Sequence, residues 1–149
     1  MAQKRVLPPT YILVAIVSMV VLHFLLPGVH IIGLPWNVLG VIPLIAGIIM
    51  NLMADRAFKK AGTTVKPYQE SVALITDGVF RVSRHPMYAG FVLILLGIAI
   101  LLGSVTSYGV IIIFAVLMDV MFIRIEEHML EETFGETWLT YKKQVRRWL

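Results

Sequence analysis

Cysteine is absent from the 149-residue sequence, which excludes disulfides, thiolate metal ligands, a cysteine nucleophile, and prenyl or palmitoyl anchors. Glycine-rich nucleotide-binding loops of the Rossmann or P-loop kind are also missing, and the glycines inside apolar stretches are more typical of close helix contacts. The four histidines, His23, His30, His85 and His128, have no metal-ligand spacing. We therefore expect no metal site.

Charge is scarce, since 15% of the residues are charged and 58% are hydrophobic. The mean hydropathy is +0.85, and a soluble domain of this size has too little interior for so many apolar side chains. The apolar residues fall in four blocks of roughly 16 to 19 residues, long enough to cross a bilayer as helices. These blocks run from about Thr10 to Leu26, from Trp36 to Ala54, from just after Pro86 to Leu102, and from Tyr108 to Ile125. We predict an all-α membrane protein with about four transmembrane helices, in a single domain over residues 1–149.

The first apolar block follows Lys4 and Arg5, as the apolar region of a secretory signal peptide does. No small-residue cleavage site comes after the block, and three further blocks follow it. We therefore interpret it as a transmembrane helix.

The basic residues indicate the sidedness of the protein. All 13 Lys and Arg residues lie in the N-terminus, in Asp55–Arg84 or from Arg124 onward, and none lies in the linkers Pro27–Pro35 and Gly103–Ser107. With four helices, the three basic regions share one side, and the positive-inside rule makes that side, with the N and C termini, cytoplasmic. We therefore attribute the pI near 9.6 to the basic residues on the cytoplasmic side of the membrane. For this reason we expect no nucleic-acid partner.

The start of the third apolar block is a candidate anion site. Pro86 suits the first turn of a helix, and the N–H groups of the next three residues would then lack partners within the helix. The helix dipole, Arg84 and His85 would all attract an anion there. The alternative is that Arg84 and His85 mark the membrane interface and that Tyr88 belongs to an aromatic belt.

The end of the fourth block places carboxylates at the same depth. A short outer loop joins the third and fourth blocks, so their inner ends are neighbours, and Glu126 would face the anion site near Pro86. A zwitterion with a carboxylate and an ammonium, such as the methionine part of S-adenosylmethionine, would fit between them. For Glu127 we favour a solvated helix end, in which it pairs with Arg124 three residues earlier.

Asp119 is the single acid inside a predicted span. It lies seven residues before Glu126 and hence on nearly the same helix face. An acid at such depth is a functional candidate, although a hydrogen bond to a neighbouring helix would explain it equally well.

The C-terminal stretch Glu136–Leu149 has the pattern of an interfacial amphipathic helix. Its apolar and aromatic residues recur at spacings of three and four, between basic residues. Such a helix would either close over the site or serve only as a membrane anchor. The residues concerned are Trp138, Tyr141, Val145 and Trp148, with Lys142, Lys143, Arg146 and Arg147 between them.

These residues resemble the superfamily of isoprenylcysteine carboxyl methyltransferases and phospholipid methyltransferases. The resemblance covers about residues 56–147 and is strongest in the Arg-His-Pro-x-Tyr-x-Gly string at Arg84–Gly90. The other matching elements are Gly62–Val65, Leu74–Thr76, Gly78–Arg81, Glu126-Glu127 with Leu130, Phe134-Gly135 and Tyr141-Lys142.

The resemblance implies an integral-membrane methyltransferase that uses S-adenosylmethionine without a Rossmann domain. The cofactor would bind at the cytoplasmic end of the helices, and a lipid-like or hydrophobic acceptor would enter from the bilayer. Carried over by position, the cofactor-binding residues would be Val72, Ala73, Leu74, Ile75, Phe80, His85, Pro86, Met87, Tyr88 and Glu126. The candidate catalytic residues would be Asp119, Arg124 and Arg84.

The chain departs from the prenylcysteine enzymes at Phe122, where they have an arginine implicated in holding the substrate carboxylate. Arg124 could substitute, but it lies on a different helix face. The chain also has fewer spans than the eukaryotic enzymes. The departures weaken prenylcysteine esterification in particular and leave two alternatives, phospholipid N-methylation and a non-catalytic protein of the same fold that binds lipid or a partner.

Overall fold

The structure is a computed structural model that describes residues 7–26, 28–63 and 71–149. Within these ranges the chain is helical, with one isolated β-bridge between His30 and Ser104. The elements are α1 (Pro8–Leu25), the 3-10 turn η1 (Trp36–Gly40), α2 (Val41–Ala61), the 3-10 turn η2 (Gly78–Arg81), α3 (Pro86–Leu102), α4 (Val105–Met118), the π-helical turn η3 (Asp119–Ile123), α5 (Arg124–Phe134) and α6 (Glu136–Gln144).

Three helical stretches are long and apolar enough to cross a membrane: α1, η1 with α2, and the continuous helix from α4 through η3 to α5. The fourth apolar helix, α3, is shorter. Outward-facing side chains such as Leu13, Ile42 and Ile112 are more than half exposed, as lipid-facing residues of membrane helices are. The prediction of an all-α fold with about four apolar spans is confirmed.

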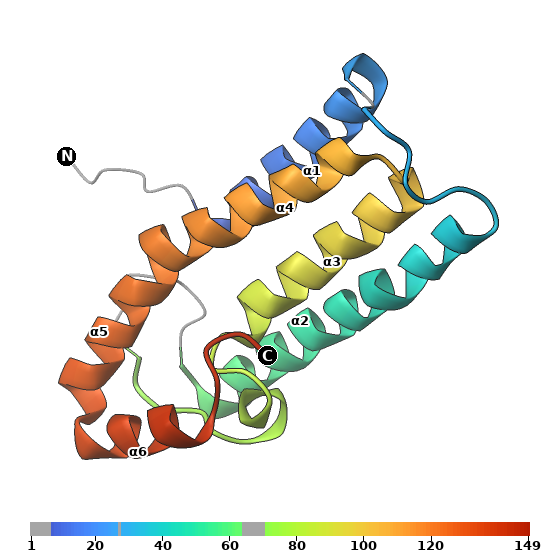
Figure 1. Cartoon of the computed structure of the whole chain (residues 1–149). Helices are drawn as coiled ribbons and strands as arrows, with labels where there is room; N and C mark the ends of the chain where they lie inside the picture. The colour runs from blue at the N-terminus through green and yellow to red at the C-terminus, as the bar shows by residue number, and fades with distance from the viewer. Residues whose placement is uncertain (1–6, 27, 64–70) are drawn as a thin grey trace.

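Helix α3 lies between α2 on one side and the pair formed by α1 and α4 on the other (Figure 1). Helix α2 packs along α3, and α1 packs along α4. A Cβ atom on Gly40 would come 2.5 Å from the carbonyl oxygen of Gly97, and Gly47 faces Gly90 just as closely. The glycines therefore let the backbones of α2 and α3 touch, as expected from the sequence.

The last span is interrupted by the π-turn η3. A π-turn holds about one residue more than an α-turn, and each residue of an α-helix advances the side chains by about 100°. The extra residue therefore separates the faces of Asp119 and Glu126, which regular seven-residue spacing would align.

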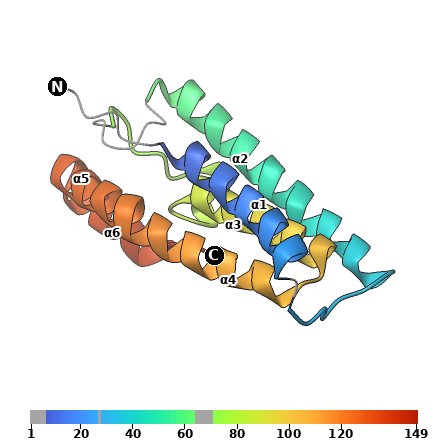
Figure 2. The same cartoon turned by 90° about the horizontal axis from the view of Figure 1, so that it is seen from above.

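Beyond the π-turn, α5 and α6 fold against each other at one end of the bundle (Figure 2). Gly135 joins them with φ of 51°, in the left-handed region that glycine adopts without strain. Trp138 and Tyr141 of α6 are buried in a second core with Ala54 and Phe80. Helix α6 ends at Gln144, so only the first nine residues of the expected Glu136–Leu149 helix are helical.

Candidate active site

A cavity of about 260 Å³ lies at this end of the bundle. The beginnings of α1 and α3, the loop before α3, and helices α5 and α6 surround it. Its walls are mostly apolar, with a polar side made by Arg84, His85, Tyr88 and Glu126. Ligand sites typically combine apolar walls with a few placed polar groups.

Glu126 lies against the first turn of α3. The Tyr88 hydroxyl donates to Glu126 Oε1 at 2.6 Å, and His85 Nδ1 is 3.4 Å from Glu126 Oε2. The structure thus brings together the carboxylate and the helix start that topology placed at one depth. One detail was wrong: the Ala89 N–H, which we expected to lack a partner, donates to the His85 carbonyl at 3.1 Å.

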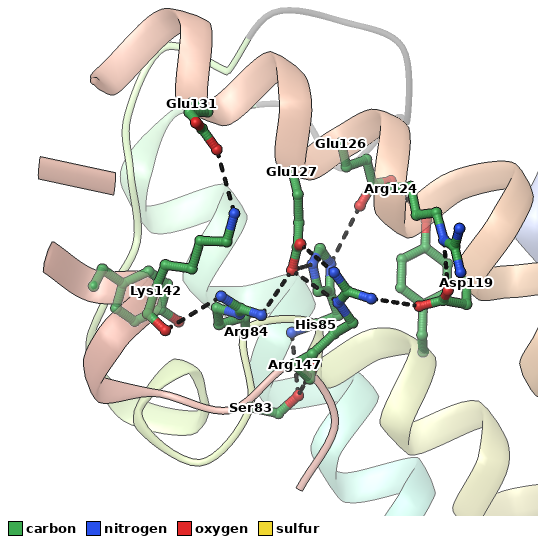
Figure 3. Close-up of polar contacts among 12 residues, drawn as sticks. Ser83, Arg84, His85, Asp119, Arg124, Glu126, Glu127, Glu131, Lys142 and Arg147 are labelled. Atoms are coloured by element: carbon green, nitrogen blue, oxygen red, sulfur yellow. Dashed lines mark hydrogen bonds and ion pairs between the residues drawn. The ribbon is translucent and has the colours of Figure 1, made fainter. Parts of the chain in front are cut away.

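Glu127 is not a solvated helix end, and that prediction was wrong. Its side chain is 6% exposed and is approached by three basic groups (Figure 3). Arg84 Nη2 is 3.0 Å from Oε1, His85 Nε2 is 3.3 Å from Oε1, and Arg147 Nη2 donates to Oε2 at 2.7 Å. Arg124 pairs instead with Asp119 at 2.8 Å.

His85 sits between the two glutamates, one at each ring nitrogen. Burial lowers the pKa of His85, but hydrogen bonds to Glu126 and Glu127 and their negative charges outweigh burial, so the net pKa is raised above 6.5. The imidazolium can donate to both carboxylates at once, whereas the neutral ring can donate to one.

Two buried donors in the cavity wall have no hydrogen-bond partner in the described part of the chain. They are Arg84 Nε and the indole Nε1 of Trp138. The Arg84 guanidinium lies 5.7 Å from the centre of the Trp138 ring, and its Nη1 donates to the Lys142 carbonyl at 3.3 Å. Unpartnered buried donors cost free energy, and both residues belong to the cavity lining, so each is a candidate to bind an acceptor group of a ligand.

Most of the expected cofactor-binding residues meet at the cavity. Those in its lining are Ala73, Leu74, Ile75, Phe80, His85, Pro86, Met87, Tyr88 and Glu126, together with Arg84 from the catalytic candidates. Val72 is 81% exposed and lies outside the lining. Thr64 and Val65 of the matching Gly62–Val65 element lie outside the described residues.

Asp119 and Arg124 do not line the cavity. Asp119 accepts from Arg124 Nε at 2.8 Å and from Arg147 Nη1 at 3.1 Å. The π-turn explains the difference, because it turns Asp119 away from the face of Glu126. Asp119 and Arg124 therefore belong to an ion-pair network behind the site.

The sequence interpretation missed Glu127 and Arg147 as site residues, and it named Trp138 only within a helix that would either close over the site or anchor the chain. Glu127 and Arg147 are 20 residues apart, so no helical periodicity predicts that they meet. Trp138 has the spacing of a membrane-facing aromatic. The adjacent pair Glu126-Glu127, which carries part of the family resemblance, was the available clue in the sequence.

The fold and the cavity define a helical membrane protein with a partly polar site at one end of its bundle. The sequence pattern of the phospholipid methyltransferase family matches residues 36–137. That match covers more than half of the chain, so the protein belongs to this family.

Curated relatives extend the comparison. Protein-S-isoprenylcysteine O-methyltransferases B and A of Arabidopsis thaliana are 35% identical over 80 residues and 36% identical over 81 residues, which is 52% of this chain in each case. The Schizosaccharomyces pombe protein-S-isoprenylcysteine O-methyltransferase is 36% identical over 75 residues. The matches cover 39%, 40% and 30% of these relatives, so the chain spans well under half of their length.

Proposed function

We propose that this chain is an S-adenosylmethionine-dependent methyltransferase, similar to isoprenylcysteine carboxyl methyltransferases, that modifies a lipid-like or hydrophobic acceptor. The observation that carries the proposal is the cavity in which Glu126 faces the α3 start and two unpartnered donors line the wall. Membership of the family and the named relatives support it.

The residues present fit the cofactor. Glu126 would hold the ammonium of its methionine part, while Arg84 Nε and Trp138 Nε1 would hold the carboxylate. Leu74, Ile75 and Phe80 supply an apolar wall for the adenosine part. When bound, the cofactor supplies an electrophilic methyl group on a sulfonium.

The protein's part is mainly to align the reactants and exclude water. With the cofactor bound, an acceptor oxygen or nitrogen would take the methyl group, and the carbon–sulfur bonding pair would stay on sulfur. A carboxylate acceptor loses no proton. An amine or hydroxyl acceptor does, and a titratable group of the cavity wall such as His85 could assist that proton transfer.

The acceptor would reach the cavity from the bilayer, because Leu7, Pro8 and Pro9 at the start of α1 form part of its wall. At the position of the arginine of the prenylcysteine enzymes, Phe122 is 1% exposed, with its ring centre 5.5 Å from that of Tyr11. A buried phenyl ring cannot hold a carboxylate. This favours, as a second candidate, an amine headgroup as acceptor, and thus phospholipid N-methylation.

The site end of the bundle would face the cytoplasm. Lys59 and Lys60 end α2, and Lys142 and Lys143 end α6 at this same end. The described linkers at the other end carry no Lys or Arg. By the positive-inside rule the protein is a multi-pass membrane protein with a cytoplasmic site.

Calorimetry with S-adenosylhomocysteine on the purified protein in detergent tests the proposal. E126Q should weaken binding about tenfold, because a carboxylate–ammonium hydrogen bond is worth roughly 1.5–3 kcal/mol. W138F, which keeps the ring and removes the donor, should weaken it about fivefold. E131Q, on the same helix but outside the cavity, is the matched control.

Binding by the wild type that E126Q leaves unchanged would overturn the assignment of Glu126. Absence of binding would favour a non-catalytic lipid- or partner-binding protein. Incubation of native membranes with methyl-labelled cofactor, followed by separation of lipid and protein fractions, would then identify whether a phospholipid amine or a prenylcysteine carboxylate gains the label.

A further inference from the structure

The last five residues, Val145–Leu149, form a strap across the back of the site. The helix ends before Val145, whose backbone is extended, and the Arg84 N–H donates to the Arg146 carbonyl at 2.9 Å. The Ser83 hydroxyl donates to the Arg147 carbonyl at 3.1 Å. Trp148 packs against the main core between the helices, so the strap is anchored at its far end.

The strap holds the α3 entry, the three residues Ser83–His85 that lead into α3. Ser83 is fully buried, and its hydroxyl also accepts the His85 N–H at 3.1 Å. One hydroxyl therefore links the strap backbone to the residue that contacts both glutamates.

The Arg147 side chain joins two carboxylates that lie on different faces of the last span. It donates to Glu127 through Nη2 at 2.7 Å and Nε at 3.3 Å, and to Asp119 through Nη1 at 3.1 Å. A guanidinium can span two carboxylates in this way because its five donors are fixed in one plane. Arg147 thus bridges the π-turn and α5 (Figure 3).

We propose that Arg147 is a positioning residue, which acts through Glu127 on the two basic side chains of the α3 entry. Arg84 and His85 both line the cavity, and both are also partners of the buried Glu127. With Arg147 in place, Glu127 receives a third basic partner from outside the cavity. Arg84 Nε then stays unpaired at the cavity wall, and His85 stays shared between its two carboxylates.

Without Arg147, only Arg84 and His85, which line the cavity, would neutralise the charge of Glu127. The Arg84 guanidinium, whose Nη2 is 3.0 Å from Glu127 Oε1, would be drawn further toward Glu127 and away from the cavity, and His85 would move toward Glu127 and away from Glu126. The part of this inference that concerns ligand binding rests on the proposed function, whereas the part that concerns the charge around His85 does not.

Every charged or titratable group that faces His85 influences the pKa that the test measures. Glu126 and Glu127 approach it from α5, Tyr88 from α3, and Arg84 from its own loop. Arg147 faces it from the strap across Glu127. Removal of Arg147 takes away a positive charge while both carboxylates stay, so the protonated form of His85 becomes more favourable.

Histidine ring NMR of the full chain in detergent micelles measures this directly. The chain has four histidines, H85Q identifies the signal of His85, and the other three serve as internal references. R147Q should raise the pKa of His85 by about one unit. R146Q removes the same charge one residue earlier from an exposed side chain, and should shift that pKa by less than about 0.3.

Calorimetry with S-adenosylhomocysteine supplies the second readout. R147Q should weaken binding about tenfold, as expected for residues coupled in one network, and R146Q should not. R147K keeps the charge, so His85 should titrate as in the wild type, but a lysine cannot span both carboxylates and binding should weaken about threefold. In the E127Q background, R147Q should have no further effect on binding.

Equal titration of His85 in R147Q and R146Q would overturn the proposal. So would an R147K protein that binds as tightly as the wild type, and this variant decides the matter if R147Q does not fold. If the wild type binds no S-adenosylhomocysteine, the proposed function fails, but the histidine titration still decides whether Arg147 acts on His85.

Discussion

Substitution of Glu127 by Gln tests how much the buried ion cluster contributes to the fold. Glu127 and Arg84 are 6% and 8% exposed in their side chains, so they form a buried pair. Removing one partner of such a pair costs about 3–5 kcal/mol, because the other charge stays buried without compensation.

Two details of the structure place the expected loss of stability near the lower end of this range. Arg147 keeps Asp119 as a partner after the substitution, and its side chain is 34% exposed, so water compensates part of its charge. The uncompensated charge is therefore mainly that of Arg84, whose other bonds go to a carbonyl. We expect E127Q to lower the free energy of unfolding by about 3 kcal/mol.

Unfolding by sodium dodecyl sulfate in mixed micelles, followed by circular dichroism, measures this loss. E131Q is the matched control, since Glu131 lies one turn further along α5 and pairs with Lys142 at 3.3 Å with both side chains more than a third exposed. An exposed pair contributes at most about 1 kcal/mol. If E127Q and E131Q lower the stability equally, the cluster is not the buried element that the exposures indicate.

Two further predictions concern packing and pH. G47A should destabilise the protein by about 1–3 kcal/mol, because the new methyl group would meet backbone atoms of α3 within 3 Å, whereas G109A, with no atom within 4 Å of the new group, should not; micelle unfolding measures both. Since the pKa of His85 is raised by folding, its contribution to stability should be complete below about pH 6.5 and disappear as the pH rises through the folded-state pKa. Unfolding measured from pH 5 to 9 should show this dependence in the wild type and in H128Q, and should show it lost in H85Q.

The sequence was sufficient to predict the apolar helices and the meeting of Glu126 with the start of α3. A long apolar block predicts a membrane-spanning helix without further information. The short turn at Gly103–Ser104 is enough to make α3 and α4 neighbours, independently of how their side chains pack. The contact of Glu126 with Tyr88 and His85 then requires only that they lie at the same depth in the membrane. That depth follows from the number of residues between each of them and the turn.

The rest of the site depends on contacts that no local pattern reports. Glu127 is buried because Arg147 returns to it from the far side of α6, and the return depends on the helix ending at Gln144 rather than continuing to Leu149. Trp138 has the spacing of an interfacial aromatic, but α6 turns that face inward against Phe80. Of the two alternatives for the C-terminal stretch, the structure agrees with the one in which it closes over the site, since Trp138 and Tyr141 line the cavity; only the expected helical length was wrong, because α6 ends at Gln144.

The π-turn at Asp119–Ile123 also separates two parts of the last span that have different partners. Before the turn, the helix packs against α1 and along α3, and after it the same helix presents neighbouring glutamates to the start of α3. If the same residues wound as a regular α-helix through this stretch, α5 would turn by about 100°, which would carry Glu126 and Glu127 off their partners without altering either of them. The spacing between the lipid-crossing half and the ligand-facing half is therefore as much a part of the site as the carboxylates themselves.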